Sequence, residues 1–100
     1  MKGFHLFSGS YENIIQVWDL KKSECIRELS EHRGAIYTIC EEDNYFFSGS
    51  YDNSVKVWNL DSLDRSIQTL IGHTSKVEAI RVSGGVIYSA SSDNTIRVWK

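Results

Sequence analysis

The sequence predicts an all-β protein built from repeated antiparallel sheets, and three observations carry this prediction. Three segments align without gaps, at residues 8–18 (SGSYENIIQVW), 48–58 (SGSYDNSVKVW) and 89–99 (SASSDNTIRVW). Their final tryptophans are 40 and 41 residues apart, and His32 and His73, which precede the later two segments, are also 41 residues apart. Proline is absent, and no stretch shows the sustained 3.6-residue period of a helix.

Each of the three segments is expected to form a β-hairpin. The first arms are short apolar stretches at residues 4–8, 45–48 and 86–89. An acidic residue followed by asparagine comes next, and these residue types tolerate left-handed backbone and bond their own main chain in tight turns. The turn pairs are Glu12-Asn13, Asp52-Asn53 and Asp93-Asn94. The second arms alternate β-branched residues with polar ones, which predicts strands.

Two further strand-like stretches lie between successive hairpins, so each period holds four strands. One kind of stretch occupies residues 25–29 and 66–71, and the other occupies residues 35–40 and 77–82. A four-stranded sheet with two apolar faces cannot bury both faces alone, but like sheets stacked around an axis cover one another. The predicted fold is therefore a partial β-propeller of about two and a half blades, with four antiparallel strands per full blade.

The expected organisation is an incomplete blade at residues 1–30, a full blade at 31–71 and a blade lacking its last strand at 72–100. Propellers close with about four to eight blades, so these residues are expected to need further blades. Those blades come either from a longer chain or from other copies of this one. A truncated product without a stable fold is a third possibility.

Composition limits the function classes. The 100 residues carry a formal net charge of −2 with scattered basic residues, so nothing favours nucleic acid or an acidic membrane surface as a partner. No apolar run approaches the roughly 20 residues that span a bilayer, and residues 1–7 do not resemble a signal peptide. Cys25 and Cys40 lack metal-binding or redox spacing and are expected to be reduced. A cytoplasmic location, or a nuclear one, is expected.

The repeated residues resemble the WD-repeat family of β-propellers. Its repeat contains Gly-His, a serine in the second strand, an aspartate in the following tight turn and Trp-Asp at the end of the third strand. The matching sets are His32, Ser48, Asp52 and Trp58, and then His73, Ser89, Asp93 and Trp99. The first segment keeps Ser8 and Trp18 but has Glu12 at the aspartate position. Glu31 precedes His32 where the family has glycine.

The resemblance implies that each set forms a buried hydrogen-bonded structural tetrad, with a partial tetrad at Ser8, Glu12 and Trp18. An imidazole N–H can satisfy the inward-pointing aspartate, and the serine hydroxyl can accept the indole N–H. By residue type, His32, Ser48 and Asp52 also make a Ser-His-Asp set. However, the set recurs in each repeat with a tryptophan competing for the serine, so no catalytic residue is expected. No metal or cofactor is expected either, because no histidine has a second histidine or a cysteine three or four residues away.

The resemblance also implies a partner-binding rim. The family's contact positions lie three and five residues after each histidine and directly before each turn acid. They fall on Tyr11, Ala35, Tyr37, Tyr51, Lys76, Glu78 and Ser92. The function expected from this resemblance is a non-catalytic scaffold that binds a protein or peptide. The alternative is a substrate-recognition part of a larger enzyme, such as a ubiquitin ligase or a kinase, whose catalytic domain lies elsewhere.

Overall fold

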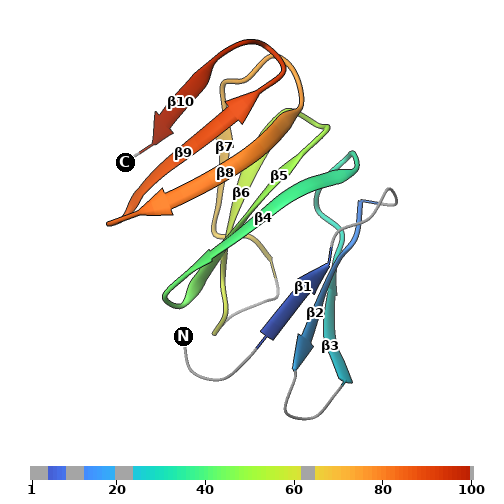
Figure 1. Cartoon of the computed structure of the whole chain (residues 1–100). Coiled ribbons are helices and arrows are strands. Elements are labelled where there is room, and N and C mark those ends of the chain that lie inside the picture. Colours follow the sequence, from blue (N-terminus) through green and yellow to red (C-terminus); the bar gives the residue numbers. More distant parts are fainter. Residues whose placement is uncertain (1–4, 9–12, 20–23, 62–64, 100) are drawn as a thin grey trace.

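The described part of the chain forms three antiparallel sheets that follow one another in chain order (Figure 1). The computed structural model describes residues 5–8, 13–19, 24–61 and 65–99. The first sheet contains β1 (His5–Ser8), β2 (Ile15–Asp19) and β3 (Glu24–Leu29). The second contains β4 (Ile36–Glu42), β5 (Tyr45–Ser50), β6 (Ser54–Asn59) and β7 (Gln68–Ile71). The third contains β8 (Val77–Ser83), β9 (Val86–Ser91) and β10 (Ile96–Trp99).

Consecutive strands pair within each sheet, so every sheet is a meander of hairpins. The predicted all-β class is confirmed for the described residues, and their three successive sheets fit the predicted partial propeller. In the described residues, no helix is long and apolar enough to cross a membrane.

The hairpin turns follow from residues that accept left-handed backbone. In the β5–β6 turn, Asn53 has a φ of 75° and its N–H donates to the Ser50 carbonyl at 3.1 Å. Asn94 has a φ of 71° in the equivalent β9–β10 turn. Gly84 and Gly85 both have positive φ in the β8–β9 turn, a conformation that glycine adopts without steric cost.

The first interface between sheets buries Ile15 and Val17 of β2, with Leu29 of β3, against Phe46 and Trp58 of the second sheet. The Phe46 and Trp58 rings stack with centroids 5.7 Å apart and planes 6° from parallel. Each fully buried aliphatic side chain stabilises the fold by about 1.5–3 kcal/mol relative to an exposed one.

The second interface uses the other face of the middle sheet. Successive side chains of a strand point to opposite faces, so Phe47 packs on the third sheet while Phe46 packs on the first. The members of this second core are Phe47, Val55, Val57, Leu70, Val77 and Ile80. Strand β4 lies beside β8, and a Cβ at Gly49 would lie only 2.6 Å from Val77 Cγ1. The glycine therefore permits the close approach of the two sheets.

The far face of the third sheet is exposed in the described part of the chain. Ile96 and Val98 are 71% and 52% exposed, although they occupy the repeat positions of Val55 and Val57, which are buried at 0% and 6%. Tyr88 pairs with Val98 across β9 and β10, so it lies on the same face. We call Tyr88, Ile96 and Val98 the open face.

Candidate functional site

A buried hydrogen-bonded network joins four side chains in the second sheet. His32 Nδ1 lies 2.8 Å from Asp52 Oδ2, and His32 Nε2 lies 2.6 Å from Ser48 Oγ. Trp58 Nε1 donates to the same Ser48 oxygen at 2.9 Å. His32, Ser48 and Trp58 are almost completely buried. The four residues that share the repeat spacing therefore share one network, which we call the second-sheet network.

The third sheet repeats this arrangement in the third-sheet network. His73 Nδ1 lies 3.0 Å from Asp93 Oδ2, and His73 Nε2 lies 2.8 Å from Ser89 Oγ. Trp99 Nε1 donates to Ser89 Oγ at 2.9 Å. Two independent copies of the geometry indicate that the side-chain types and their spacing determine it.

The donors and acceptors in each network assign the protons. A carboxylate only accepts, so Nδ1 of His32 carries a hydrogen and donates to Asp52. The Ser48 oxygen accepts from the Trp58 indole, which leaves the serine O–H free to donate to Nε2 of the histidine. Every polar group is used, and no buried side-chain nitrogen or oxygen among the described residues lacks a partner. Such complete pairing avoids the cost of about 1–3 kcal/mol for each unsatisfied buried group.

The turn aspartates are held as carboxylates. Burial alone raises the pKa of Asp52, but hydrogen bonds from His32, the Ser54 hydroxyl and the Arg33 N–H outweigh it and hold the pKa well below its usual range. The Thr95 hydroxyl does most to lower the pKa of Asp93, against partial desolvation and with help from the Thr74 N–H.

Hydroxyl residues that the sequence reasoning missed complete the networks. Ser54 Oγ donates to Asp52 Oδ1 at 2.6 Å, and Thr95 does the same for Asp93. Ser50 Oγ accepts the Asp52 N–H at 3.1 Å and donates to the Gly34 carbonyl at 3.0 Å, and Ser91 is its counterpart in the third sheet. The aligned segments carried the signal, because both complete repeats have a hydroxyl directly after the turn asparagine, whereas the first segment has Ile14 there.

Part of the first segment lies outside the described residues. Glu12 of the predicted partial tetrad and Tyr11 of the predicted rim both fall there. Ser8 and Trp18 lie on the paired strands β1 and β2, and Trp18 is half-buried. The segment reaches the second-sheet network through Asn13, whose Nδ2 donates to the His32 carbonyl at 2.5 Å.

The geometry argues against nucleophilic chemistry at the Ser-His-Asp sets. Ser48 and Ser89 are buried, and each oxygen already accepts a tryptophan N–H, so neither can reach a substrate carbonyl. Among the described residues, no group of three or more His, Cys, Asp or Glu side chains could hold a metal ion. The two networks are structural supports for the adjacent rim.

The rim that the two networks support is formed by the beginnings of β4 and β8 and by the β5–β6 and β9–β10 turns. The Tyr51 N–H donates to the Ala35 carbonyl at 2.9 Å, and the Ser92 N–H donates to the Lys76 carbonyl at 3.1 Å. β-Bulges fall at Tyr37 in β4 and at Glu78 in β8, where the pairing register shifts by one residue. A bulge re-aims the side chain of the extra residue. We use the name rim for Ala35, Tyr37, Tyr51, Lys76, Glu78 and Ser92.

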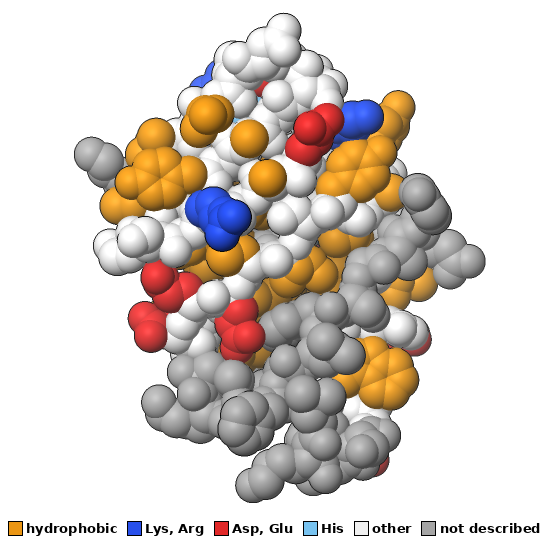
Figure 2. Space-filling view, in the orientation of Figure 1, with side chains coloured by type: hydrophobic (Ala, Val, Ile, Leu, Met, Phe, Trp, Pro, Cys, Tyr) orange, Lys and Arg blue, Asp and Glu red, His pale blue; other side chains and the backbone are white. Residues whose placement is uncertain are grey.

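The rim side chains contact one another across two sheets. Tyr37 and Tyr51 are 39% and 60% exposed, and their rings meet edge to face with centroids 6.2 Å apart. Lys76 Nζ of the third sheet lies 5.5 Å from the Tyr37 ring centroid, within cation–π distance. The Ser92 hydroxyl donates to Glu78. Figure 2 shows hydrophobic side chains on one face of the molecule among scattered charges of both signs.

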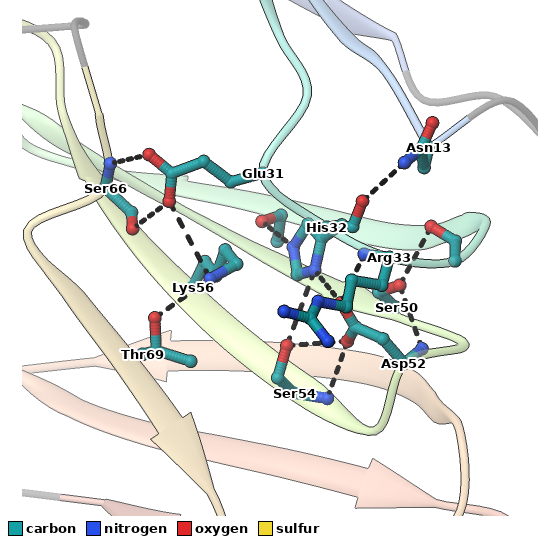
Figure 3. Close-up of polar contacts among 12 residues, drawn as sticks. Asn13, Glu31, His32, Arg33, Ser50, Asp52, Ser54, Lys56, Ser66 and Thr69 are labelled. Carbon is teal, nitrogen blue, oxygen red and sulfur yellow. Dashed lines mark hydrogen bonds and ion pairs between the residues drawn. The ribbon is translucent and has the colours of Figure 1, made fainter.

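Glu31, at the position where the family has glycine, makes further hydrogen bonds and an ion pair outside the two networks (Figure 3). Its carboxylate accepts the Ser66 hydroxyl at 2.6 Å and the Ser66 N–H at 2.9 Å, and it lies 3.7 Å from Lys56 Nζ. Partial burial raises the pKa of Glu31, but the Ser66 bonds and Lys56 outweigh it and lower the pKa overall. The side chain joins the segment before β4 to the connection between β6 and β7.

Comparison with known proteins gives a family and several solved structures. The family model described as "WD domain, G-beta repeat" matches residues 23–59 and 64–100. The computationally designed proteins Ika4 and Ika8 each align over 99% of this chain with 26% identity and a TM-score of 0.88. U3-55K aligns over 96% of it with 31% identity and a TM-score of 0.87. The chain spans 61% of Ika4, 31% of Ika8 and 30% of U3-55K. No curated protein sequence matches.

Proposed function

Because the chain belongs to the WD-repeat family, whose repeats generally serve as protein-interaction scaffolds, we propose that it binds a protein or peptide at the rim. The single observation that carries this proposal is the exposed Tyr37–Tyr51 pair, which is fixed in place from two directions. A β-bulge directs Tyr37, and the turn that holds Tyr51 is bonded to the segment before β4.

Two features make such a pair suitable for binding. Tyrosine offers a large, rigid apolar area with a polar tip and loses little conformational entropy when it is covered. The underlying loops are already ordered, because the Arg33 backbone N–H donates to Asp52 Oδ2 at 2.9 Å and Gly34 fits tightly under Tyr51. A partner therefore meets a preformed surface, which lowers the entropic cost of association.

The test replaces both tyrosines in the whole chain with alanine (Tyr37→Ala with Tyr51→Ala). Proteins captured by the immobilised wild-type chain are identified by mass spectrometry, and their affinities are measured for both forms. We expect the double variant to bind each rim partner at least about tenfold more weakly, because truncating aromatic anchors costs about 2 kcal/mol or more. Its circular dichroism spectrum should not change, since both rings lie on the surface.

Tyr88→Ala is the matched control. Tyr88 is as exposed as Tyr37 but lies on the open face, so its loss should leave capture unchanged. A folded Tyr37→Ala/Tyr51→Ala variant that retains every partner at wild-type affinity would remove the rim from consideration.

A further inference from the structure

We propose that a second binding site lies between the second and third sheets, at the end of β4 opposite the rim. It is a groove of about 360 Å³ whose apolar walls are Tyr45, Phe47, Val57, Ile67, Val82 and Ile87. Its occupant is a peptide segment that carries an apolar side chain next to lysine or arginine. The volume lies within the range of about 300–1,000 Å³ that is usual for ligand pockets.

The apolar walls supply the first argument. Ile67 is 54% exposed at this groove, and Tyr45 is also exposed, whereas Phe47 and Val57 belong to the core below them. An apolar side chain placed in the groove would remove the exposed part of these walls from water. The groove therefore selects for an apolar anchor.

The walls are held in position before any partner arrives. The Ile67 N–H donates to the Val57 carbonyl at 2.8 Å, which fixes one wall to β6. Val82 and Ile87 are paired across β8 and β9 and pack on the core of the second interface. A site that is already formed avoids the ordering cost that a mobile surface would pay on binding.

Charge supplies the second argument and the chemistry of the occupant. Glu42 and Asp43 line the groove, and none of the described residues that line it is a lysine, arginine or histidine. Lys56 and Arg81 directly precede the wall residues Val57 and Val82, but successive side chains of a strand point to opposite faces, and neither basic residue lines the groove. Another cavity, of about 390 Å³, is lined by Arg33 and Lys56 as well as by acidic residues, so it has no such preference. The groove therefore favours a basic segment and repels an acidic one.

The test selects peptides from a random linear library on the immobilised whole chain. We expect the selected peptides to contain an aromatic or aliphatic residue beside lysine or arginine, and to shift the backbone amide resonances of Ile67 and Val82. The Ile67→Ser variant should bind them about tenfold more weakly, as expected for the loss of an apolar contact at a hot spot. The Glu42→Gln/Asp43→Asn variant should also bind them more weakly and show less salt dependence. Asparagine can keep the positive φ of 55° that position 43 requires.

Two controls separate this site from the others. Ile96→Ser makes the same substitution at an exposed isoleucine on the open face and should leave peptide affinity unchanged. The Tyr37→Ala/Tyr51→Ala variant should also keep it, so failure at the rim and failure at the groove are distinguishable. Should Ile67→Ser lose its folded circular dichroism spectrum, Tyr45→Ser replaces it. The proposal is overturned if no peptide is selected, if the peptides are acidic, or if folded groove variants bind them as wild type does.

Discussion

Asp52 shows how a single side chain can order a turn. Its carboxylate accepts from the imidazole of His32, from the Arg33 N–H and from both the N–H and the hydroxyl of Ser54. These donors come from the segment before β4 and from β6, so Asp52 joins its own turn to both of these parts of the chain. Hydrogen bonds from His32, Ser54 and the Arg33 N–H stabilise the charge of this carboxylate.

Acid should therefore weaken the fold through this residue. A carboxyl whose pKa is lower in the folded state than in the unfolded chain stabilises the fold above the unfolded pKa, near 3.8 for Asp, and this stabilisation is lost as the pH falls toward the folded pKa. We expect the free energy of unfolding to fall between about pH 5 and pH 2. In Asp52→Asn the stability at neutral pH should be lower and the acid-dependent loss smaller. Urea unfolding at several pH values measures both, and identical pH profiles would contradict this role of Asp52.

The sequence could indicate the network residues because they recur at the same spacing in two repeats. The sequence could not show which of the nearby serine and threonine hydroxyls would join the networks. Ser50, Ser54 and Thr95 are small polar residues near a turn, and several backbone groups compete for such side chains. Which hydrogen bond forms depends on the backbone conformation of the turn, which has a positive φ at Asn53 in one turn and at Asn94 in the other.

At the scale of the element, β6 and β10 show that a neighbouring sheet determines burial. Their sequences SVKVWN and IRVW share the alternation of β-branched and polar residues, and both form the strands that this pattern predicts. Val57 is buried against the third sheet, whereas Val98 is exposed. The period of two predicts which residues share a face, but it does not say whether that face is covered. The bulges at Tyr37 and Glu78 were also beyond prediction, because an extra residue leaves no mark in such short apolar stretches.

Equivalent substitutions in these strands should therefore have unequal effects. Val57→Ala should lower the free energy of unfolding by about 2 kcal/mol, from lost transfer free energy and the cavity that remains. Val98→Ala should change it by less than about 0.5 kcal/mol, as surface substitutions usually do. Chemical denaturation of the two variants makes the comparison, and equal losses would show that Val98 is covered in solution.

At the scale of the whole molecule, each interface joins one face of a sheet to the opposite face of the next sheet. The first sheet offers Ile15 and Val17 to the second, and the second offers Val55 and Val57 to the third. The third sheet presents the corresponding face as the open face, in which Tyr88, Ile96 and Val98 lie together. A contiguous exposed apolar surface of this kind promotes association.

The 100-residue chain should consequently self-associate through the open face. Ile96→Lys should reduce the concentration-dependent increase in mass measured by light scattering, because a charge there would have to be desolvated. Ile71→Lys is the matched control, since Ile71 is also exposed but lies on β7 of the second sheet. Association that persists in Ile96→Lys, or that both variants lose equally, would assign it to another surface.

The close approach at Gly49 makes the second and third repeats non-interchangeable. The third repeat has Ala90 at the corresponding position, and Gly49 tolerates the Val77 methyl groups only because it has no side chain. A sheet identical to the third could not seat its valine against Ala90 as Val77 sits against Gly49, and it would have to carry a smaller residue or stand farther away. Steric matching at this point therefore distinguishes the second repeat from the third, because exchanging the two would place a methyl group where the structure has no room for one.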